Sequence, residues 1–188
     1  MPGVIGIAGS LRRGSYNAAL LRETRELAPP GLAIEIAAIR DIPLYDGDVE
    51  TEAGVPAPVR ALKERLAAAD GLLLVTPEYN NSIPGVLKNV IDWLSRPSAD
   101  IPRVFGGKPV ALMGATPGRG GTTLAQAAWL PVLRTLGTQA WSGPRVAISD
   151  AAKVFDADGR IVDQAVRASV GKFLLGFAAF IGRAGRRG

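Results

Sequence analysis

The chain has 188 residues, of which 47% are hydrophobic, so it can bury one sizeable core, and we expect a single domain over residues 1–188. It contains no cysteine and no histidine, which excludes disulfides, thiolate nucleophiles, Cys/His metal sites and the commonest general base. Any chemistry must therefore come from carboxylates, hydroxyls, Lys, Arg, the backbone or a bound cofactor.

The net charge of +5 favours anionic partners, but part of it lies at the C-terminal end of the chain. Arg183, Arg186 and Arg187 belong to a basic Gly/Ala/Arg tail, at about residues 183–188, which we expect to be frayed. We interpret the charge as this tail plus scattered surface arginines, and expect no nucleic-acid partner. The chain has no run of about 18 apolar residues, and its first apolar stretch is too short for a secretion signal. We therefore expect no membrane association and a cytoplasmic location.

The first third of the chain predicts a strand, a helix and a second strand. Residues 4–8 form a short apolar run typical of a buried strand, and a polar connection follows at 9–17. Helical spacing of apolar residues begins at Ala18 and ends at the Pro-Pro-Gly sequence of 29–31. Residues 32–37 then alternate in the manner of a second strand.

The middle of the chain predicts a long loop, a helix and a fully buried strand. Residues 41–55 are rich in Asp, Pro and Gly, and indicate a loop whose one apolar anchor is Pro43-Leu44-Tyr45. Apolar residues at helical spacing from Val59 to Ala69 predict the second helix. Residues 72–75 are continuously apolar, which is typical of a strand covered on both faces of a parallel sheet.

Residues 77–82 predict a tight connection between this strand and the next helix. The helix shows one apolar stripe from Ile83 to Leu94, and Asn81 or Ser82 is the predicted N-cap. Pro84 is tolerated in the first turn, where its missing N–H costs little. Loops of this kind lie at the carboxyl edge of an open sheet, where such folds bind ligands.

The last part of the chain predicts two more strands and two more helices. After a loop rich in proline and glycine, residues 108–114 predict the fourth strand, and a glycine-rich turn follows at 115–121. A helix then runs to about Leu136, and a fifth strand lies within 138–148, broken near Ser142-Gly143-Pro144. A turn at 156–159 precedes the final helix, whose apolar stripe is Val166, Val170, Phe173, Leu174, Phe177 and Ile181.

Strict alternation of strands and helices indicates an α/β fold with a doubly wound parallel sheet and helices on both faces. Two strand orders are common for such sheets, the dinucleotide-binding order and the flavodoxin-like order 2-1-3-4-5. Five strands favour the second, so we predict a flavodoxin-like five-stranded sheet.

The segment 9–17 has the properties of a phosphate-binding loop. It leads from a strand into the start of a helix, where free backbone N–H groups and partial positive charge attract anions. Ser10, Ser15 and Asn17 can donate hydrogen bonds there, and Arg12 can form a charge-assisted pair. The alternative is a polar turn in which Ser15 only caps the helix.

Two better-known phosphate motifs are absent from this segment. Gly9 and Gly14 have the glycine spacing of a P-loop, but Ser15 stands where that motif requires lysine. The glycines also do not form G-x-G-x-x-G, although Glu35 lies where a ribose-binding acid could be. A terminal phosphate monoester therefore suits the segment better than a pyrophosphate.

In the predicted strand order, the loops after the first, third and fourth strands meet at one edge of the sheet. The first would bind a phosphate, and the third offers backbone groups, a Tyr ring and an Asn amide to a flat heteroaromatic ring. The fourth, at 115–121, has glycines that permit close approach of the backbone. A planar ligand that carries a phosphate, such as FMN, satisfies all three loops.

The same residues resemble a known family. The similar segments are Gly9-Ser10-Leu11-Arg12 with Ser15 and Asn17, Pro77-Glu78-Tyr79-Asn80 with Ser82, and Pro84-Gly85-Val86-Leu87-Lys88-Asn89. They closely resemble the NAD(P)H-dependent FMN reductases, which include the chromate, quinone and azo reductases of flavodoxin-like fold. The resemblance extends through most of the chain, to the turn at 156–159 and the last helix.

The resemblance implies a non-covalent FMN, with NADPH or NADH as co-substrate and a small-molecule electron acceptor. It implies that the phosphate lies at Ser10, Arg12, Ser15 and Asn17, and the ring along 77–80 with further contacts from 116–118. The full set of candidate cofactor-binding residues is Ser10, Leu11, Arg12, Ser15, Tyr16, Asn17, Pro77, Glu78, Tyr79, Asn80, Ser82, Thr116, Pro117 and Gly118. A homodimer or homotetramer is also implied. We assign no catalytic acid or base, because the cofactor would supply the chemistry.

Two other functions are compatible with the same fold. One is a flavodoxin-type electron carrier without its own NAD(P)H oxidation, although the basic net charge disfavours it. The other is a flavin-free regulatory module. We also expect Trp93, Trp129 and Trp141 to lie in the core or an interface rather than against a ligand.

Overall fold

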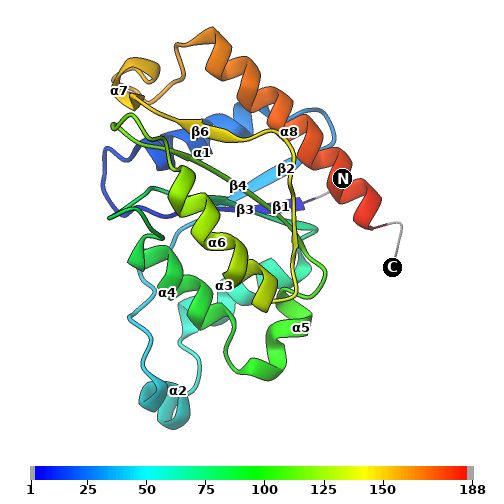
Figure 1. Cartoon of the computed structure of the whole chain (residues 1–188). Coiled ribbons are helices and arrows are strands. Elements are labelled where there is room, and N and C mark those ends of the chain that lie inside the picture. The colour runs from blue at the N-terminus through cyan, green and yellow to red at the C-terminus, as the bar shows by residue number, and fades with distance from the viewer. Residues whose placement is uncertain (1–2, 186–188) are drawn as a thin grey trace.

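The computed structural model describes residues 3–185 and places a parallel β-sheet at the centre of the molecule (Figure 1). The strands are β1 (Gly3–Ala8), β2 (Ala33–Ala37), β3 (Gly71–Val75), β4 (Pro109–Ala115), β5 (Gln139–Ala140) and β6 (Val146–Ile148). Their order is β2-β1-β3-β4-β5, with β6 also paired to β4. The predicted order 2-1-3-4-5 is therefore confirmed.

The fifth strand is broken, as the Gly-Pro sequence predicts. β5 pairs with the beginning of β4, where Pro109 is opposite Gln139, and β6 pairs with its end, where Met113 is opposite Val146. The interrupted segment includes Pro144, which has no N–H to donate to a ladder. Because of this break, β5 and β6 pair with two separate parts of β4.

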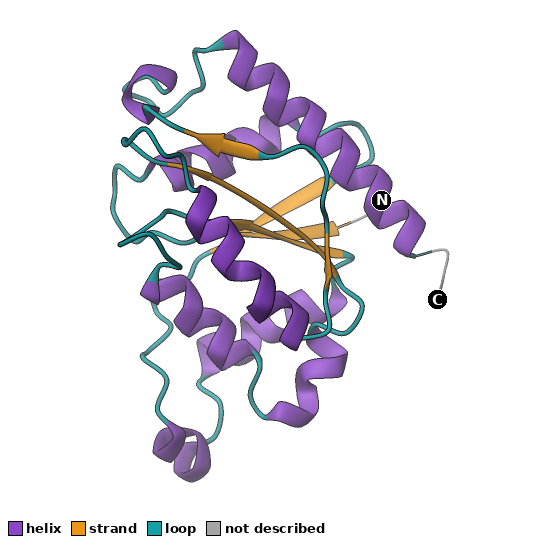
Figure 2. Cartoon of the chain, in the orientation of Figure 1, coloured by secondary structure: helices purple, strands orange, loops and turns teal. Residues whose placement is uncertain are grey.

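Helices cover both faces of the sheet (Figures 1 and 2). One face carries α1 (Tyr16–Leu27) and α8 (Gln164–Ala184), and the other carries α3 (Ala57–Ala68), α4 (Gly85–Leu94) and α6 (Thr123–Thr135). Alternate residues of β3 belong to the two separate apolar clusters, with Leu73 in one and Leu72 in the other. This period-two alternation, with both sides apolar, explains why the sequence of β3 is a continuous apolar run.

The predicted loop at 41–55 is wrong in part, because it contains the helix α2 (Gly47–Ala53). Asp46 caps this helix by accepting a hydrogen bond from the N–H of Asp48 at 2.9 Å, yet α2 buries no residue. Figure 2 shows α2 projecting from the rest of the molecule. Leu44 is 83% exposed, whereas the Tyr45 ring packs edge-on against Trp93.

Three further short helices lie in segments where we predicted no helix. They are η1 (Ser98–Asp100), α5 (Ile101–Val104) and α7 (Ala151–Val154). The N-cap of α4 also differs from the prediction: it is Pro84, without a side-chain hydrogen bond, rather than Asn81 or Ser82. Arg183 lies in the last turn of α8 instead of a frayed tail, and Arg186 and Arg187 lie outside the described residues.

α8 is long and apolar enough to cross a membrane by length and composition alone. In this fold it lies along the sheet, where Phe173, Leu174 and Phe177 are buried in the core. Val170 and Ile181 are buried beside them, so one apolar side of α8 packs on the core.

Candidate active site

The three loops predicted to meet do so, at the carboxyl ends of β1, β3 and β4. They enclose a cavity of about 480 Å³. Its lining residues are Ser10, Arg12, Ser15, Tyr16, Asn17, Pro77, Glu78, Tyr79, Ala115, Thr116 and Pro117. Ten of the fourteen candidate residues are thus brought together, whereas Leu11, Asn80, Ser82 and Gly118 do not line the cavity.

The first wall of the cavity is the N-terminus of α1. Ser15 is the N-cap, and its Oγ accepts a hydrogen bond from the N–H of Ala18 at 3.2 Å. Within residues 3–185, the backbone N–H groups of Tyr16 and Asn17 have no hydrogen-bond acceptor. Both are first-turn donors that point along the helix axis, so this end of the cavity can bind an anion.

Arg12 adds a full positive charge to the same wall. Its guanidinium lies 5.8 Å from the centre of the Tyr16 ring, within the range of a cation–π contact. The side chain is exposed, and no carboxylate pairs with it in the part of the chain that the structure describes. Its donors are therefore free for a phosphate.

Asn17 has a different use from the one we predicted. Its side chain is buried; the amide Nδ2 donates to the carbonyl of Ala115 at 2.8 Å, and Oδ1 accepts from the N–H of Ala115 at 2.9 Å. Both polar atoms of the side chain thus join α1 to the end of β4. The backbone N–H of Asn17, rather than its side chain, is left for an anion.

The second wall, the loop after β3, contains a tight two-residue turn. The N–H of Tyr79 donates to the carbonyl of Ser82 at 3.3 Å, and the N–H of Ser82 donates back at 3.0 Å. The central residues Asn80 and Asn81 have φ angles of 50° and 60°, in the left-handed region that Asn tolerates better than most residues. Asn80 and Ser82 therefore shape the loop without lining the cavity.

This turn places Tyr79 over the first loop. The Tyr79 hydroxyl donates to Ser10 Oγ at 3.3 Å, and the ring is 47% exposed at the mouth of the cavity. Pro77, beside it, is buried. The second wall thus presents a flat apolar surface, formed by Pro77 and the Tyr79 ring, with the Tyr79 hydroxyl at its end.

Glu78 does not point a free carboxylate into the cavity. Its Oε2 accepts hydrogen bonds from the N–H groups of Leu124, at 2.8 Å, and Ala125, at 3.0 Å, in the first turn of α6. Thr122, the N-cap of that helix, makes no side-chain capping bond. Glu78 is therefore the cap of α6, supplied from another loop.

The third wall is the loop after β4. The N–H of Thr116 donates to the carbonyl of Ile148 in β6 at 2.9 Å, which ties this loop to the broken strand. Gly114 lies so close to the backbone of β3's loop that a Cβ there would be 2.1 Å from the carbonyl oxygen of Thr76. Only glycine permits that approach.

Sequence analysis missed one residue beside the site, Arg40. It lies after β2 and its Nη2 donates to the carbonyl of Leu11. The Leu11 side chain packs against the apolar cluster under α3 and α4 rather than facing the cavity. No motif marks Arg40, because the contact depends on two loops that are separated in sequence.

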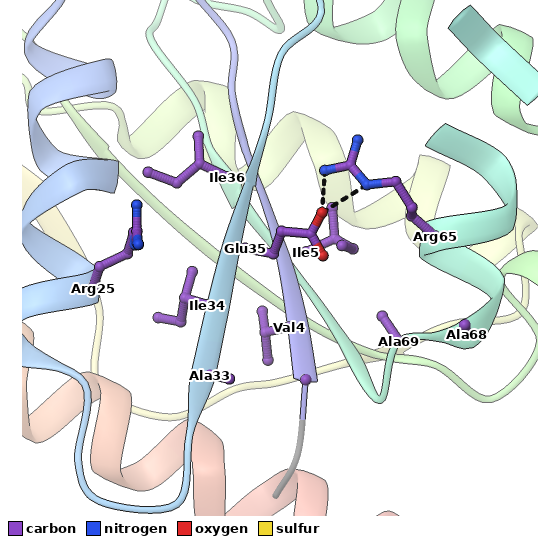
Figure 3. Close-up of a pocket in the computed structure, with 11 residues that line it drawn as sticks. Val4, Ile5, Arg25, Ala33, Ile34, Glu35, Ile36, Arg65, Ala68 and Ala69 are labelled. Atoms are coloured by element: carbon purple, nitrogen blue, oxygen red, sulfur yellow. Dashed lines mark hydrogen bonds and ion pairs between the residues drawn. The ribbon is translucent and has the colours of Figure 1, made fainter. Parts of the chain in front are cut away.

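A larger cavity, of about 570 Å³, lies beside β2 and away from these loops (Figure 3). Its walls are mainly apolar, and Glu35 within it pairs with Arg65, with 2.5 Å between Oε1 and Nη2. Glu35 is opposite Ile5, three residues before the end of β1. Glu35 therefore pairs with Arg65 at a distance from the carboxyl edge of the sheet. A ribose-binding acid would have to lie at that edge.

We expected all three tryptophans in the core or an interface, and the structure places two of them fully in the core. Trp93 and Trp129 are fully buried, and the Nε1 of Trp129 donates to Thr76 Oγ1 at 3.2 Å. Trp141 is half-buried and packs edge-on against Phe173. None of the three lines the loop cavity.

Comparison with known proteins agrees with this geometry. Residues 2–153 match the family described as NADPH-dependent FMN reductase. An NAD(P)H-dependent FMN reductase of Pseudomonas aeruginosa is 49% identical over 164 residues, covering 87% of this chain and 86% of that protein. A quinone reductase of Escherichia coli K12 is 39% identical over 184 residues, covering 96% and 95% of the two chains.

A solved structure supports the same relationship. FerB, a flavoenzyme NAD(P)H:(acceptor) oxidoreductase from Paracoccus denitrificans, superimposes with a TM-score of 0.88 and 35% identity, covering 98% of this chain and 99% of its own. The family match alone covers well over half of the sequence. The chain therefore belongs to the NADPH-dependent FMN reductase family of oxidoreductases.

Proposed function

We propose that this chain binds one FMN without a covalent bond in the loop cavity and reduces it with NADPH or NADH. The proposal rests on one observation: the same cavity combines an anion-binding end with a flat, mainly apolar wall. Arg12 and the free N–H groups of Tyr16 and Asn17 form an anion-binding end, and Pro77 and Tyr79 form a flat wall beside it. A phosphate joined to a planar ring requires both.

The residues present fit FMN in this arrangement. Ser10, Arg12, Ser15 and the first turn of α1 would hold the phosphate, with Leu11 supporting the loop from behind. Pro77, Glu78, Tyr79, Thr116 and Pro117 would contact the ring, and Asn80 and Ser82 would fix the turn that carries Tyr79. The bound flavin would supply the redox chemistry by accepting a hydride and passing electrons on.

The protein's own part is to bind and orient. The chain contains no histidine, and the carboxylate of Glu78 is engaged at the N-terminus of α6. We therefore assign no catalytic acid or base among the residues that line the cavity. Burial of the ring between the loops would exclude water from one side of it.

We propose a quinone as the class of acceptor. The E. coli relative named quinone reductase covers nearly the whole chain, which supports that choice over the alternatives. Chromate, azo compounds and free flavin are the other acceptors that an assay should include. Whether NADPH or NADH is preferred follows from the same assay with each donor.

We propose that the chain forms a homodimer or homotetramer and acts in the cytoplasm on small molecules. The projecting segment around α2 supports self-association. It exposes Leu44 and Val49, and residues 41–59 carry five acidic groups and no Lys or Arg, in a chain whose net charge is +5. An acidic, partly apolar arm is complementary to the basic remainder of a second copy. Light scattering coupled to size exclusion measures the state directly.

An absorbance experiment tests the flavin assignment. The purified protein is titrated with FMN and then mixed with NADPH or NADH without oxygen. A flavin spectrum that bleaches supports the proposal, whereas bound flavin that neither donor bleaches would favour an electron carrier. Failure to bind flavin at saturating FMN would contradict the assignment of all three loops and favour a flavin-free regulatory module.

Arg12→Ala gives a second test of the phosphate end of the cavity. Loss of its charge should weaken FMN binding by at least about tenfold, because a charge-assisted pair to phosphate is lost. Arg13→Ala is a suitable comparison, since Arg13 is an exposed neighbour that does not line the cavity. Equal FMN affinity of wild type and Arg12→Ala would remove Arg12 from the site.

A further inference from the structure

Arg40 contacts the phosphate-binding loop from outside the cavity, and no motif or comparison assigns it a role. Its guanidinium donates a hydrogen bond to the carbonyl of Leu11, 29 residues earlier in the chain. We propose that Arg40 is a positioning residue that holds this loop in the conformation that binds a phosphate. The inference rests on the proposed binding of FMN and names a residue that the proposed site does not include.

The two loops emerge next to each other because β1 and β2 are paired in parallel. Ile7 is opposite Ala37, so the chain leaves both strands at nearly the same level of the sheet. Ile39 and Leu11 then pack in the same apolar cluster. This shared packing sets the separation of the loops, and Arg40, the residue after Ile39, reaches across it.

The bond acts on the peptide group that leads into Arg12. The carbonyl of Leu11 and the N–H of Arg12 belong to one planar unit, so fixing the oxygen also fixes the direction of that N–H. The same N–H donates to Ser10 Oγ at 3.4 Å, a long and weak bond. Arg40 therefore holds a peptide that local contacts hold poorly.

The rest of the loop has few other supports. The N–H of Gly9 is bonded to Val75 at its beginning, and the N–H of Ser15 to Arg12 at its end. Between them, Tyr79 supports Ser10 from the β3 side, and Arg40 supports Leu11 from the β2 side. The loop is thus held from both sides, at the neighbouring residues Ser10 and Leu11.

The positive charge of Arg40 also favours phosphate binding. No carboxylate forms an ion pair with it among residues 3–185, so its charge adds to that of Arg12 near the loop. Guanidinium also suits the contact because its planar, fixed donors lose less freedom on bonding than a flexible ammonium does. A loss of Arg40 should therefore reduce affinity for the phosphate and leave affinity for the ring unchanged.

The test compares Arg40→Gln with Arg60→Gln in the full-length protein. Arg60 is a matched control, because it is exposed and its Nη1 donates to a backbone carbonyl, that of Val55, away from the loop cavity. Binding of FMN and of riboflavin, which lacks the phosphate, is measured by quenching of flavin fluorescence. Circular dichroism and thermal melts of both variants report any loss of folding.

We expect Arg40→Gln to weaken FMN binding by about tenfold and riboflavin binding by less than about twofold. Arg60→Gln should bind both flavins as the wild type does, and Arg40→Lys should recover part of the FMN affinity. Unchanged FMN affinity in Arg40→Gln, or an equal loss for FMN and riboflavin, would overturn the proposal. If the wild type itself binds no FMN, the proposed function also fails. That result differs from the two outcomes above, in which the wild type binds FMN.

Discussion

The carboxylate of Glu78 caps the helix α6 by accepting a hydrogen bond from the N–H of Leu124 at 2.8 Å, 46 residues farther along the chain. A second bond, from Ala125, is 3.0 Å long. The negative charge also lies where the helix dipole is positive. Because Glu78 belongs to the loop after β3, and α6 follows the loop after β4, this contact joins two walls of the cavity.

We predict that Glu78→Ala lowers the free energy of unfolding by about 1–2 kcal/mol, because two first-turn N–H groups lose their acceptor and the helix loses its capping charge. Glu78→Gln should have a smaller effect, since its amide oxygen can still accept without a charge. Urea denaturation of the three proteins measures both differences. Stability equal to the wild type in Glu78→Ala would mean that Thr122 or water replaces the cap.

This cap also shows what the sequence could and could not predict. The strand order could be predicted from local patterns, because most strands are short apolar runs, such as β3 from Gly71 to Val75. A helix also lies in each connection from β1 to β5. The break of the fifth strand follows from Gly143-Pro144 for the same local reason. A carboxylate that caps a helix 46 residues away leaves no local pattern.

The errors around α2 and α4 have physical causes too. α2 has capping signals at Asp46 and acidic residues in its first turn, but it buries no residue, so it has no apolar period to recognise. At α4, Asn81 has the composition of an N-cap, but it occupies the left-handed turn instead. At α2 the apolar signal is missing, and at α4 one residue type suits two roles, between which tertiary structure decides.

Asn17 gives the second prediction, on the bond between α1 and β4. Asn17→Ala should lower the free energy of unfolding by about 2–3 kcal/mol, because it leaves the buried N–H and carbonyl of Ala115 without the amide that satisfies them. Thr24→Val is a control on the same helix: Thr24 is also buried, but its hydroxyl bonds only to Leu21 within the helix. That control should lose less than about 1 kcal/mol. Similar losses in the two variants would contradict a special role for Asn17.

The turn at Asn80 and Asn81 gives the third prediction. Asn81 has a φ of 60°, so Asn81→Gly should leave stability unchanged or slightly higher, whereas Asn81→Val should lower it by about 1–2 kcal/mol. The turn carries Tyr79, whose hydroxyl reaches Ser10, so Asn81→Val should also weaken FMN binding. Urea denaturation and FMN titration of both variants measure the two effects. If glycine and valine behave alike, the turn does not have this conformation in solution.

The ion pair between Lys63 and Asp100 gives a prediction about pH. Lys63 is only 3% exposed, and its Nζ is 3.1 Å from Asp100 Oδ2. The hydrogen bond from Lys63, with further attraction to Lys63 and Arg103, holds the pKa of the Asp100 carboxyl below its ordinary value. Because this pKa is lower in the folded protein than in the unfolded chain, the pair stabilises the fold above the ordinary Asp pKa. That contribution is lost as the pH falls through the lower, folded-state pKa.

Asp100→Asn should therefore lower the free energy of unfolding by about 1–2 kcal/mol at pH 7, because it leaves the charge of a buried Lys63 without its counter-charge. The difference from wild type should narrow as the pH falls below about 4, where the unfolded carboxyl is protonated. Glu35→Gln is the control, because the side chains of its pair with Arg65 are 59% and 40% exposed and should contribute under about 0.5 kcal/mol. Denaturant melts at several pH values measure both variants. A loss in Asp100→Asn that stays constant between pH 7 and pH 3 would show that packing around Asp100, rather than its charge, stabilises this part of the fold.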